Sequence, residues 1–234
     1  MSIVTTEKRG SIMILTLNRP ESLNALGAEG DGVAIAAACN EIVADPSIRC
    51  VILTGAGRAF SAGGDVKAMK EGTGAFGGAP HDIREGYRRN IHMIVKSLYN
   101  LEVPMIAAVN GAAIGLGCDV ACMADIRIAS DKAKMGVTFL KLGLIPGDGG
   151  AWLLPRLIGS SRAAELLFTG KVIAAQPPQA LRLAKTLMRH GANASYETIM
   201  EMSAASQALM HKTEDHMEGV NAILEKRTPD FKGR

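Results

Sequence analysis

The chain has 234 residues, 47% hydrophobic and 21% charged, which is the balance of an ordinary globular protein with one substantial core. A net charge of +3 with scattered basic residues gives no reason to expect a nucleic-acid partner. Apolar runs are too short to span a membrane, and MSIVTTEKRG lacks the layout of a signal peptide. Four cysteines without framework spacing indicate reduced thiols in a cytoplasmic protein. Cys118 and Cys122 have no nearby histidine to complete a metal site, so no metal is predicted.

The first part of the chain alternates strands and helices. Residues 11–17 alternate as a strand does and, with the residues before them, predict an opening hairpin. Apolar residues at helical spacing predict a helix over 28–44, which Pro46 ends. The remaining predicted elements are strands at 50–54, 105–110 and 125–130, a helix over 81–101, and loops at 71–80 and 111–117. This order predicts parallel pairing, and the chain becomes almost wholly helical from Gly149 onward.

Two glycine-rich turns stand out, FSAGGD at 60–65 and AIGLGCD at 113–119. The first follows Gly55-Ala56-Gly57, but the third position of a dinucleotide fingerprint would be the bulky Phe60, which excludes that interpretation. If two parallel strands bring the turns side by side, two backbone N–H groups can converge on one oxygen as an oxyanion hole. The alternative is that both are only tight turns, with an acid favoured at the start of each following helix.

Three ordered motifs, FSAGGD, PMIAAVNGAAIGLGCDVACMADIRIAS and KLGLIPGDGG, resemble those of the crotonase superfamily, the enoyl-CoA hydratase/isomerase group. The resemblance extends from LNRPESLNAL near the start to KRTPDFKGR at the end. It implies an α/β fold, with a crotonase-like spiral of ββα units over 1–175 and a C-terminal α-helical region over 176–234. That region is expected to form a homotrimer or a dimer of trimers. The substrate implied is an acyl-CoA thioester, so coenzyme A is part of the substrate and no cofactor is permanently bound.

The resemblance also implies site residues. The backbone N–H groups of Gly64 and Leu116 match two oxyanion donors. Most relatives have glycine at the second position, but leucine can serve there because the donor is the main chain. Lys232 is a further candidate to face a phosphate of CoA. The positions that match those lining the thioester, the nucleotide or the rest of the ligand are Ser22, Ala25, Ala62, Asp65, Val66 and Lys67.

Hydratases that this sequence resembles use two glutamates to move protons. The first corresponds to Asp119, which is one methylene shorter, and the second corresponds to Phe139, which carries no acid. Asp148 in IPGDGG is the nearest replacement in sequence. It is predicted either as a working acid or as the N-cap of a helix from Ala151.

The five histidines are predicted to lie at the surface, and Ser61 lacks the flanking glycines of a nucleophile elbow. After Ile173 the chain runs directly into Gln176, where relatives have another helix and strand. That unit is either deleted or belongs to a mobile segment outside these 234 residues.

The predicted function is enoyl-CoA hydratase/isomerase chemistry, either double-bond isomerisation or hydration, through a stabilised enolate. A catalytically impaired acyl-CoA-binding protein is the alternative. A nucleotide-dependent reductase is a weaker one.

Overall fold

The structure is a computed structural model that describes residues 2–131, 133–170, 178–227 and 229–234. It divides into two compact units, each assembled from two stretches of the chain. Unit 1 comprises Met1–Asp65 and Arg89–Met135, and unit 2 comprises Val66–Arg88 and Gly136–Arg234. The predicted boundary between residues 175 and 176 falls at 171–177, outside the described residues, and it stays a prediction.

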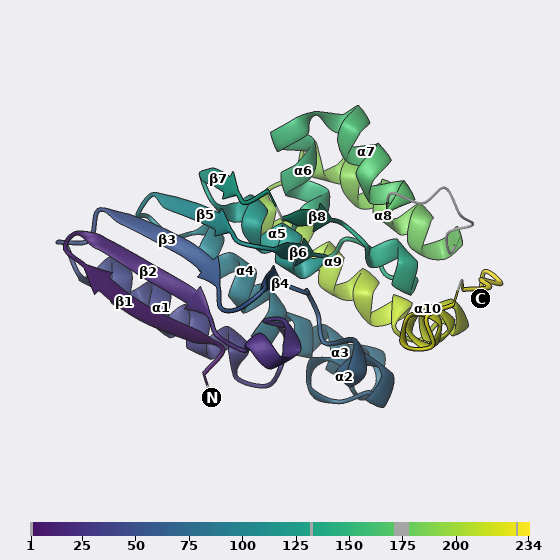
Figure 1. The fold of residues 1–234 in the computed structure, drawn as a ribbon. Helices are drawn as coiled ribbons and strands as arrows, with labels where there is room; N and C mark the ends of the chain where they lie inside the picture. Colours follow the sequence, from purple (N-terminus) through teal and green to yellow (C-terminus); the bar gives the residue numbers. More distant parts are fainter. Residues whose placement is uncertain (1, 132, 171–177, 228) are drawn as a thin grey trace. The chain divides into compact units, whose positions relative to one another are not determined.

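Unit 1 is built on a five-stranded sheet in the order β1-β2-β3-β5-β7 (Figure 1). Strands β1 and β2 form the predicted antiparallel hairpin, and β3, β5 and β7 continue the sheet in parallel. The parallel pairing predicted from the alternation of elements is therefore confirmed. The strands are β1 (Val4–Arg9), β2 (Ile12–Leu17), β3 (Cys50–Gly55), β5 (Met105–Val109) and β7 (Ile126–Ala129).

One face of this sheet is covered by helices α1 (Asp31–Ala44) and α4 (His92–Tyr99), which also contact each other. Figure 1 shows α1 running behind β1 and β2. Side chains alternate in burial along the central strands, so that Val51 and Leu53 of β3 are completely buried and their neighbours are not. This alternation is the period of two that a half-buried strand requires.

A second, three-stranded sheet has the order β4-β6-β8. Its strands are β4 (Ala59–Ser61), β6 (Ala112–Ile114) and β8 (Lys134–Gly136). The prediction of a loop over 111–117 is therefore wrong, because β6 lies within it and pairs in parallel with β4. Three residues are too few to show alternation in sequence, and only the pairing makes this segment a strand. Helix α5 (Leu116–Met123) follows β6 directly.

Unit 2 is helical, as predicted for the chain beyond Gly149. Side chains cap two of its helices, because Ser195 Oγ accepts from Thr198 N at 3.2 Å and Thr213 Oγ1 accepts from His216 N at 3.1 Å. The elements are α2 (Val66–Glu71), η2 (Gly74–Phe76), α3 (Pro80–Gly86), η4 (Phe139–Leu142), α6 (Gly150–Ile158), α7 (Ser160–Thr169), α8 (Pro178–Gly191), α9 (Tyr196–Met210) and α10 (Glu214–Leu224).

The helix predicted over 81–101 is interrupted. Between α3 and α4 lies η3 (Tyr87–Ile91), a π-helical turn, and the boundary between the two units falls inside it, after Arg88. Within unit 2, Arg84 and Arg88 both bind Glu201 of α9, at 2.8 Å and 3.0 Å. A π turn is a frequent feature of functional segments in helices.

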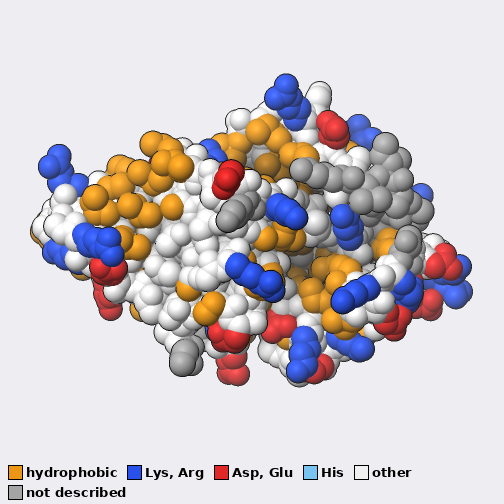
Figure 2. All heavy atoms as spheres, viewed as in Figure 1, with side chains coloured by type: hydrophobic (Ala, Val, Ile, Leu, Met, Phe, Trp, Pro, Cys, Tyr) orange, Lys and Arg blue, Asp and Glu red, His pale blue; other side chains and the backbone are white. Residues whose placement is uncertain are grey.

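The surface carries no strong charge bias on the face that Figure 2 presents, where basic and acidic side chains are interspersed. Within the described part of the chain, no helix has both the length and the apolar character needed to cross a membrane. All four cysteines are free thiols, and Cys118 and Cys122 are buried in unit 1. The same described residues contain no cluster of three or more metal-ligand side chains.

Candidate active site

The first glycine-rich turn leaves β4 and passes directly beside the second turn. Gly63 has φ 93°, in the left-handed region. A Cβ at this position would lie 2.4 Å from the carbonyl oxygen of Ile114 and 3.4 Å from the nitrogen of Leu116. Any side chain at Gly63 would therefore collide with the second turn. This glycine is needed for the two turns to approach each other.

Gly64 lies between two residues that hydrogen-bond to Leu26. Leu26 forms an isolated parallel bridge with Gly64 by donating its N–H to Gly63 O at 2.8 Å and accepting from Asp65 N at 3.2 Å. Both bonds use the residues flanking Gly64. The N–H of Gly64 accordingly has no hydrogen-bond acceptor among the described residues.

The second turn presents another such amide. Gly115 has φ 52° and ψ −120°, and α5 begins at Leu116. The first N–H groups of a helix have no partner inside it, and that of Leu116 has none elsewhere in the described chain. A Cβ on Gly117 would lie 2.4 Å from Ser61 O, so the first turn of α5 packs against the end of β4. The structure thus brings the two turns together within unit 1.

Asp119 lies in the first turn of α5 and is completely buried. Its N–H donates to Gly115 O at 3.1 Å, which fixes it one turn from the Leu116 amide. A carboxylate at this end of a helix is favoured by the helix dipole. Asp119 therefore lies on the same short helix, in the same unit, as the second unpaired amide.

Asp148 belongs to unit 2 and is 4% exposed, and no described residue binds its Oδ1 atom. Burial raises the pKa of this carboxyl to about 7. The predicted capping role is contradicted, because α6 begins at Gly150 with Gly149 as its N-cap, and no side chain caps it. Asp148 is therefore a buried acid that can gain or lose a proton near neutral pH.

Two histidines form a buried cluster with Tyr87 in unit 2. Tyr87 Oη and His211 Nε2 are 2.9 Å apart, and the rings of His211 and His216 meet edge to face at 4.4 Å. His216 Nδ1 donates to Leu142 O at 2.8 Å. Burial, with His216 and Lys212 nearby, keeps the pKa of His211 well below its ordinary value, and burial also lowers the pKa of His216. Burial and the charge of Asp148 raise the pKa of Tyr87.

The prediction that every histidine lies at the surface is wrong for three of the five, because His92, His211 and His216 are buried. His81 and His190 are exposed, as predicted. Sequence carried no signal for the cluster, since its members come from separate elements. The charge of Asp148 contributes to the raised pKa of Tyr87. The cluster of Tyr87 and the two histidines therefore lies near Asp148 in unit 2.

The residues predicted to line CoA divide between the units. In unit 1 the early loop runs beside the first turn, since Ala62 N donates to Leu23 O at 2.8 Å between the predicted residues Ser22 and Ala25. Asp65 ends the unit 1 segment, and unit 2 begins with Val66 and Lys67. The Lys67 side chain is 80% exposed. In unit 2, Phe139 is buried at the start of η4.

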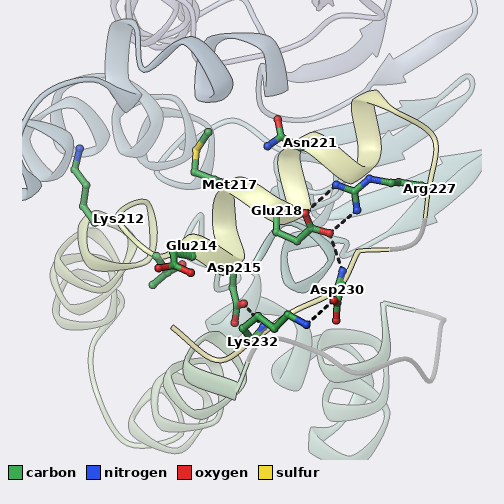
Figure 3. Close-up of a pocket in the computed structure, with 10 residues that line it drawn as sticks. Lys212, Glu214, Asp215, Met217, Glu218, Asn221, Arg227, Asp230 and Lys232 are labelled. Atoms are coloured by element: carbon green, nitrogen blue, oxygen red, sulfur yellow. Dashed lines mark hydrogen bonds and ion pairs between the residues drawn. The ribbon is translucent and has the colours of Figure 1, made fainter.

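A groove of about 660 Å³ in unit 2 lies along α10 and the end of the chain (Figure 3). Lys232, suggested above as a phosphate ligand, lines it and its ammonium binds Asp230 at 2.5 Å. Glu218 binds Arg227 beside it, so two ion pairs lie along this part of the groove in Figure 3. None of the residues matched to the oxyanion donors, the acids or the CoA-lining positions lies in this groove.

The structure is that of an α/β protein in which two glycine-rich turns lie against each other within unit 1. Residues 7–178 match the family model for enoyl-CoA hydratase/isomerase. The chain therefore belongs to the enoyl-CoA hydratase/isomerase family of the crotonase superfamily.

Individual proteins agree with this assignment. The chain is 36% identical to a probable mitochondrial enoyl-CoA hydratase of Dictyostelium discoideum, over 97% of this chain and 90% of the relative. It is 34% identical to the 1,2-epoxyphenylacetyl-CoA isomerase of Escherichia coli, over the whole of both chains. The crystal structure of an enoyl-CoA hydratase subunit from Geobacillus kaustophilus superposes with a TM-score of 0.64 at 31% identity, covering 99% of this chain and 98% of the other.

The alignment with one of these relatives contains positions that this chain does not fill. The alignment of the chain with the E. coli isomerase spans 265 positions, whereas the whole chain has 234 residues, so the relative has residues that this chain lacks. The place predicted for the missing helix and strand, after Ile173, lies at 171–177 and outside the described residues.

Proposed function

We propose that this protein acts on acyl-CoA thioesters through an enolate, whose oxygen is held by the backbone N–H groups of Gly64 and Leu116. The observation that supports this most directly is that two unpaired amides lie on touching turns of one unit. An enolate gains negative charge on the thioester oxygen, and fixed N–H donors stabilise that charge without having to reorganise. Losing one such donor typically costs about 2.7–4 kcal/mol of transition-state stabilisation.

Two acids are proposed to move the protons. Asp148 is the base, because a carboxyl with a pKa of about 7 can both take and return a proton at neutral pH. Asp119 orients the reacting water or shares the proton transfer. With Phe139 at the position of the second family glutamate, one base shuttling a proton is the simpler chemistry, which favours double-bond isomerisation over hydration. The names of the relatives divide in the same way between isomerase and hydratase.

The remaining matched residues are proposed to hold the CoA part of the substrate. Ser22, Ala25 and Ala62 belong to adjoining segments of unit 1, and Lys67 offers an exposed ammonium to a phosphate. Asp65 and Val66 complete this set. Coenzyme A would then arrive as part of the substrate, with no separate cofactor required.

Asp119→Asn tests the proposal. We expect hydration of crotonyl-CoA to fall by about a hundredfold, because the neutral amide cannot take a proton from water, while isomerisation of a 3-enoyl-CoA falls less. Both rates are measured by absorbance with wild type and variant side by side. Unchanged rates for both substrates in the variant would remove Asp119 from the mechanism.

Phe139 favours a second candidate, an acyl-CoA-binding protein that has lost catalysis. The same assay separates the two functions. Tight binding of CoA thioesters by calorimetry, with no turnover of either substrate by wild type, would establish the binding protein. Turnover with saturation kinetics would exclude it.

We also propose that residues 176–234 form an oligomerisation region, giving a homotrimer or a dimer of trimers. Helix α10 carries large apolar side chains at the surface, with Met217 at 37% exposure, Ile223 at 44% and Leu224 at 43%. Such exposed groups mark interfaces when they gather on one element. Light scattering on purified protein is expected to give three or six times the mass of one chain. A monomer at micromolar concentration would contradict this assignment.

A further inference from the structure

Asn24 occupies the centre of the loop that precedes α1, and its side chain is completely buried. Its backbone is left-handed, with φ 57°, a conformation that asparagine tolerates better than most residues. Its Oδ1 accepts from Arg19 N at 2.8 Å. Its Nδ2 donates to Ala56 O and Ala59 O at 2.9 Å and reaches Phe60 O at 3.2 Å. One amide side chain therefore joins the early loop to both ends of the turn between β3 and β4.

Ser61 continues this connection into the first glycine turn. Its hydroxyl donates to Asn24 O at 2.8 Å, and the same oxygen accepts from Gly63 N at 3.1 Å. Ser61 is fully buried, and its backbone oxygen and Cβ lie where a side chain on Gly117 would otherwise go. Ser61 thus touches the segments that carry both unpaired amides.

The early loop also holds the turn by main-chain bonds. Ala62 N donates to Leu23 O at 2.8 Å, and Leu26 bonds to the residues on either side of Gly64. Main-chain hydrogen bonds therefore join residues 62, 63 and 65 to residues 23–26. The N–H of Gly64, which lies between them, makes no such hydrogen bond among the described residues. The orientation of the Gly64 N–H is therefore set by the hydrogen bonds of its neighbours. One of these neighbours, Gly63, donates its N–H to the Ser61 hydroxyl.

We propose that Asn24 and Ser61 are positioning residues that aim the Gly64 amide at the thioester oxygen. This inference rests on the function proposed above. A preorganised donor is worth most when its direction is fixed before the reaction, and a displacement of about 1 Å can cost about a hundredfold in rate. Removal of the Ser61 hydroxyl leaves the Gly64 donor in place but frees the turn to move. The loss should therefore be smaller than the loss caused by deleting a donor.

Ser61→Ala is the test, because it removes one oxygen with little change in volume. We expect kcat for a CoA thioester to fall about tenfold with KM changed less than about twofold, since the donor acts mainly in the transition state. A substrate analogue labelled with ¹³C at the thioester carbonyl provides a second reading. Its infrared carbonyl frequency should shift less on binding to the variant than on binding to wild type.

Thr54→Val is the matched control. The Thr54 hydroxyl also makes a hydrogen bond inside unit 1, donating to Ala108 O at 2.9 Å, but it lies in β3 and not in the turn. If both variants lose similar stability in urea and only Ser61→Ala loses kcat and carbonyl shift, the positioning role is supported. Equal effects of the two variants on kcat, or an unchanged kcat in Ser61→Ala, would overturn it.

Hydrogen exchange separates this proposal from the proposed function. The Gly63 amide should be protected in wild type and in Thr54→Val, and it should exchange faster in Ser61→Ala by about tenfold or more, as expected for an opened local hydrogen bond. If wild type neither binds nor converts CoA thioesters while this pattern holds, the proposed function is wrong, but Ser61 still holds the first turn in place. If Gly63 exchange is the same in all three proteins, Ser61 does not hold the turn, and the positioning proposal is wrong.

Discussion

Replacing Leu116 with proline should lower kcat for acyl-CoA substrates by about 10²–10³-fold, the loss typical of removing one oxyanion donor. Proline differs from other residues in having no backbone N–H. Leu116 is the first residue of α5, the one helical position where proline is well tolerated, because the N–H there has no helical partner. The substitution therefore removes the proposed donor with little reason for α5 to unfold.

Leu116→Ala is the control for this experiment. The Leu116 side chain is buried, so both variants lose its packing, and only the proline variant also loses the N–H. The ratio of their kcat values isolates the donor. Circular dichroism and urea unfolding of both variants check that unit 1 remains folded. Equal kcat values for the alanine and proline variants would show that the Leu116 amide does not take part in the reaction.

Much of the candidate site could be predicted because its signals are local. Gly63 and Gly64 follow an apolar segment, and Gly115 precedes a helix with an acid in its first turn. Each of these patterns is contained in a few consecutive residues and can be recognised without knowing the rest of the fold. The parallel order of β3, β5 and β7 followed from the alternation of strands and helices. A backbone N–H is present whatever the side chain, so the second turn could be recognised although position 116 is leucine and not glycine.

What could not be predicted depends on contacts between distant segments. Strand β6 has three residues and exists through its pairing with β4, more than fifty residues earlier in the chain. The bonds of Asn24 to Ala56 and Ala59 span 32 and 35 residues of sequence, and nothing in LNRPESLNAL specifies them. His211 is the C-cap of α9 and His216 lies in the first turn of α10, and both are buried where they contact Tyr87 and Leu142.

The case of Asp148 shows why a short pattern can fit two structures. An aspartate followed by two glycines before a helix suits an N-cap as well as a free acid in a turn. The decision depends on where the helix begins, and a difference of one residue separates the two. Here the helix begins at Gly150 with Gly149 as its cap, which leaves the Asp148 carboxyl buried with no capping role. Burial without that bond is also what raises its pKa.

Asp148→Asn is expected to lower activity and raise stability together. As the base, Asp148 works in its ionised form, so the wild-type rate should rise with pH through about 7, and the variant should lose that rise with a loss of about 10²–10⁴-fold. The stability effect follows from the same carboxyl. Because its pKa rises from 3.8 when unfolded to about 7 when folded, the folded protein keeps a proton that the unfolded chain releases.

The sign of the pH dependence is therefore fixed. The contribution of Asp148 to stability should decrease as pH rises from about 4 to about 7 and then stay constant, since above 7 both states have lost this proton. With about 1.4 kcal/mol for each pKa unit, the total is about 4 kcal/mol at most. Asparagine has no proton to lose, so the variant should unfold at higher urea concentration than wild type at pH 8 and at nearly the same concentration near pH 4.

Asp45→Asn provides the opposite control. Asp45 is at the surface, and its bonds with Lys8 and Ser47 lower its pKa to about 2, so its replacement should give no stabilisation at pH 8. If Asp148→Asn is stabilised at pH 8 but keeps full activity with an unchanged pH profile, Asp148 is a buried acid outside the reaction. If it is neither stabilised nor less active, its carboxyl is already ionised in the folded protein. Stabilisation joined to loss of activity would indicate that the protein retains a destabilising buried acid because the reaction requires it.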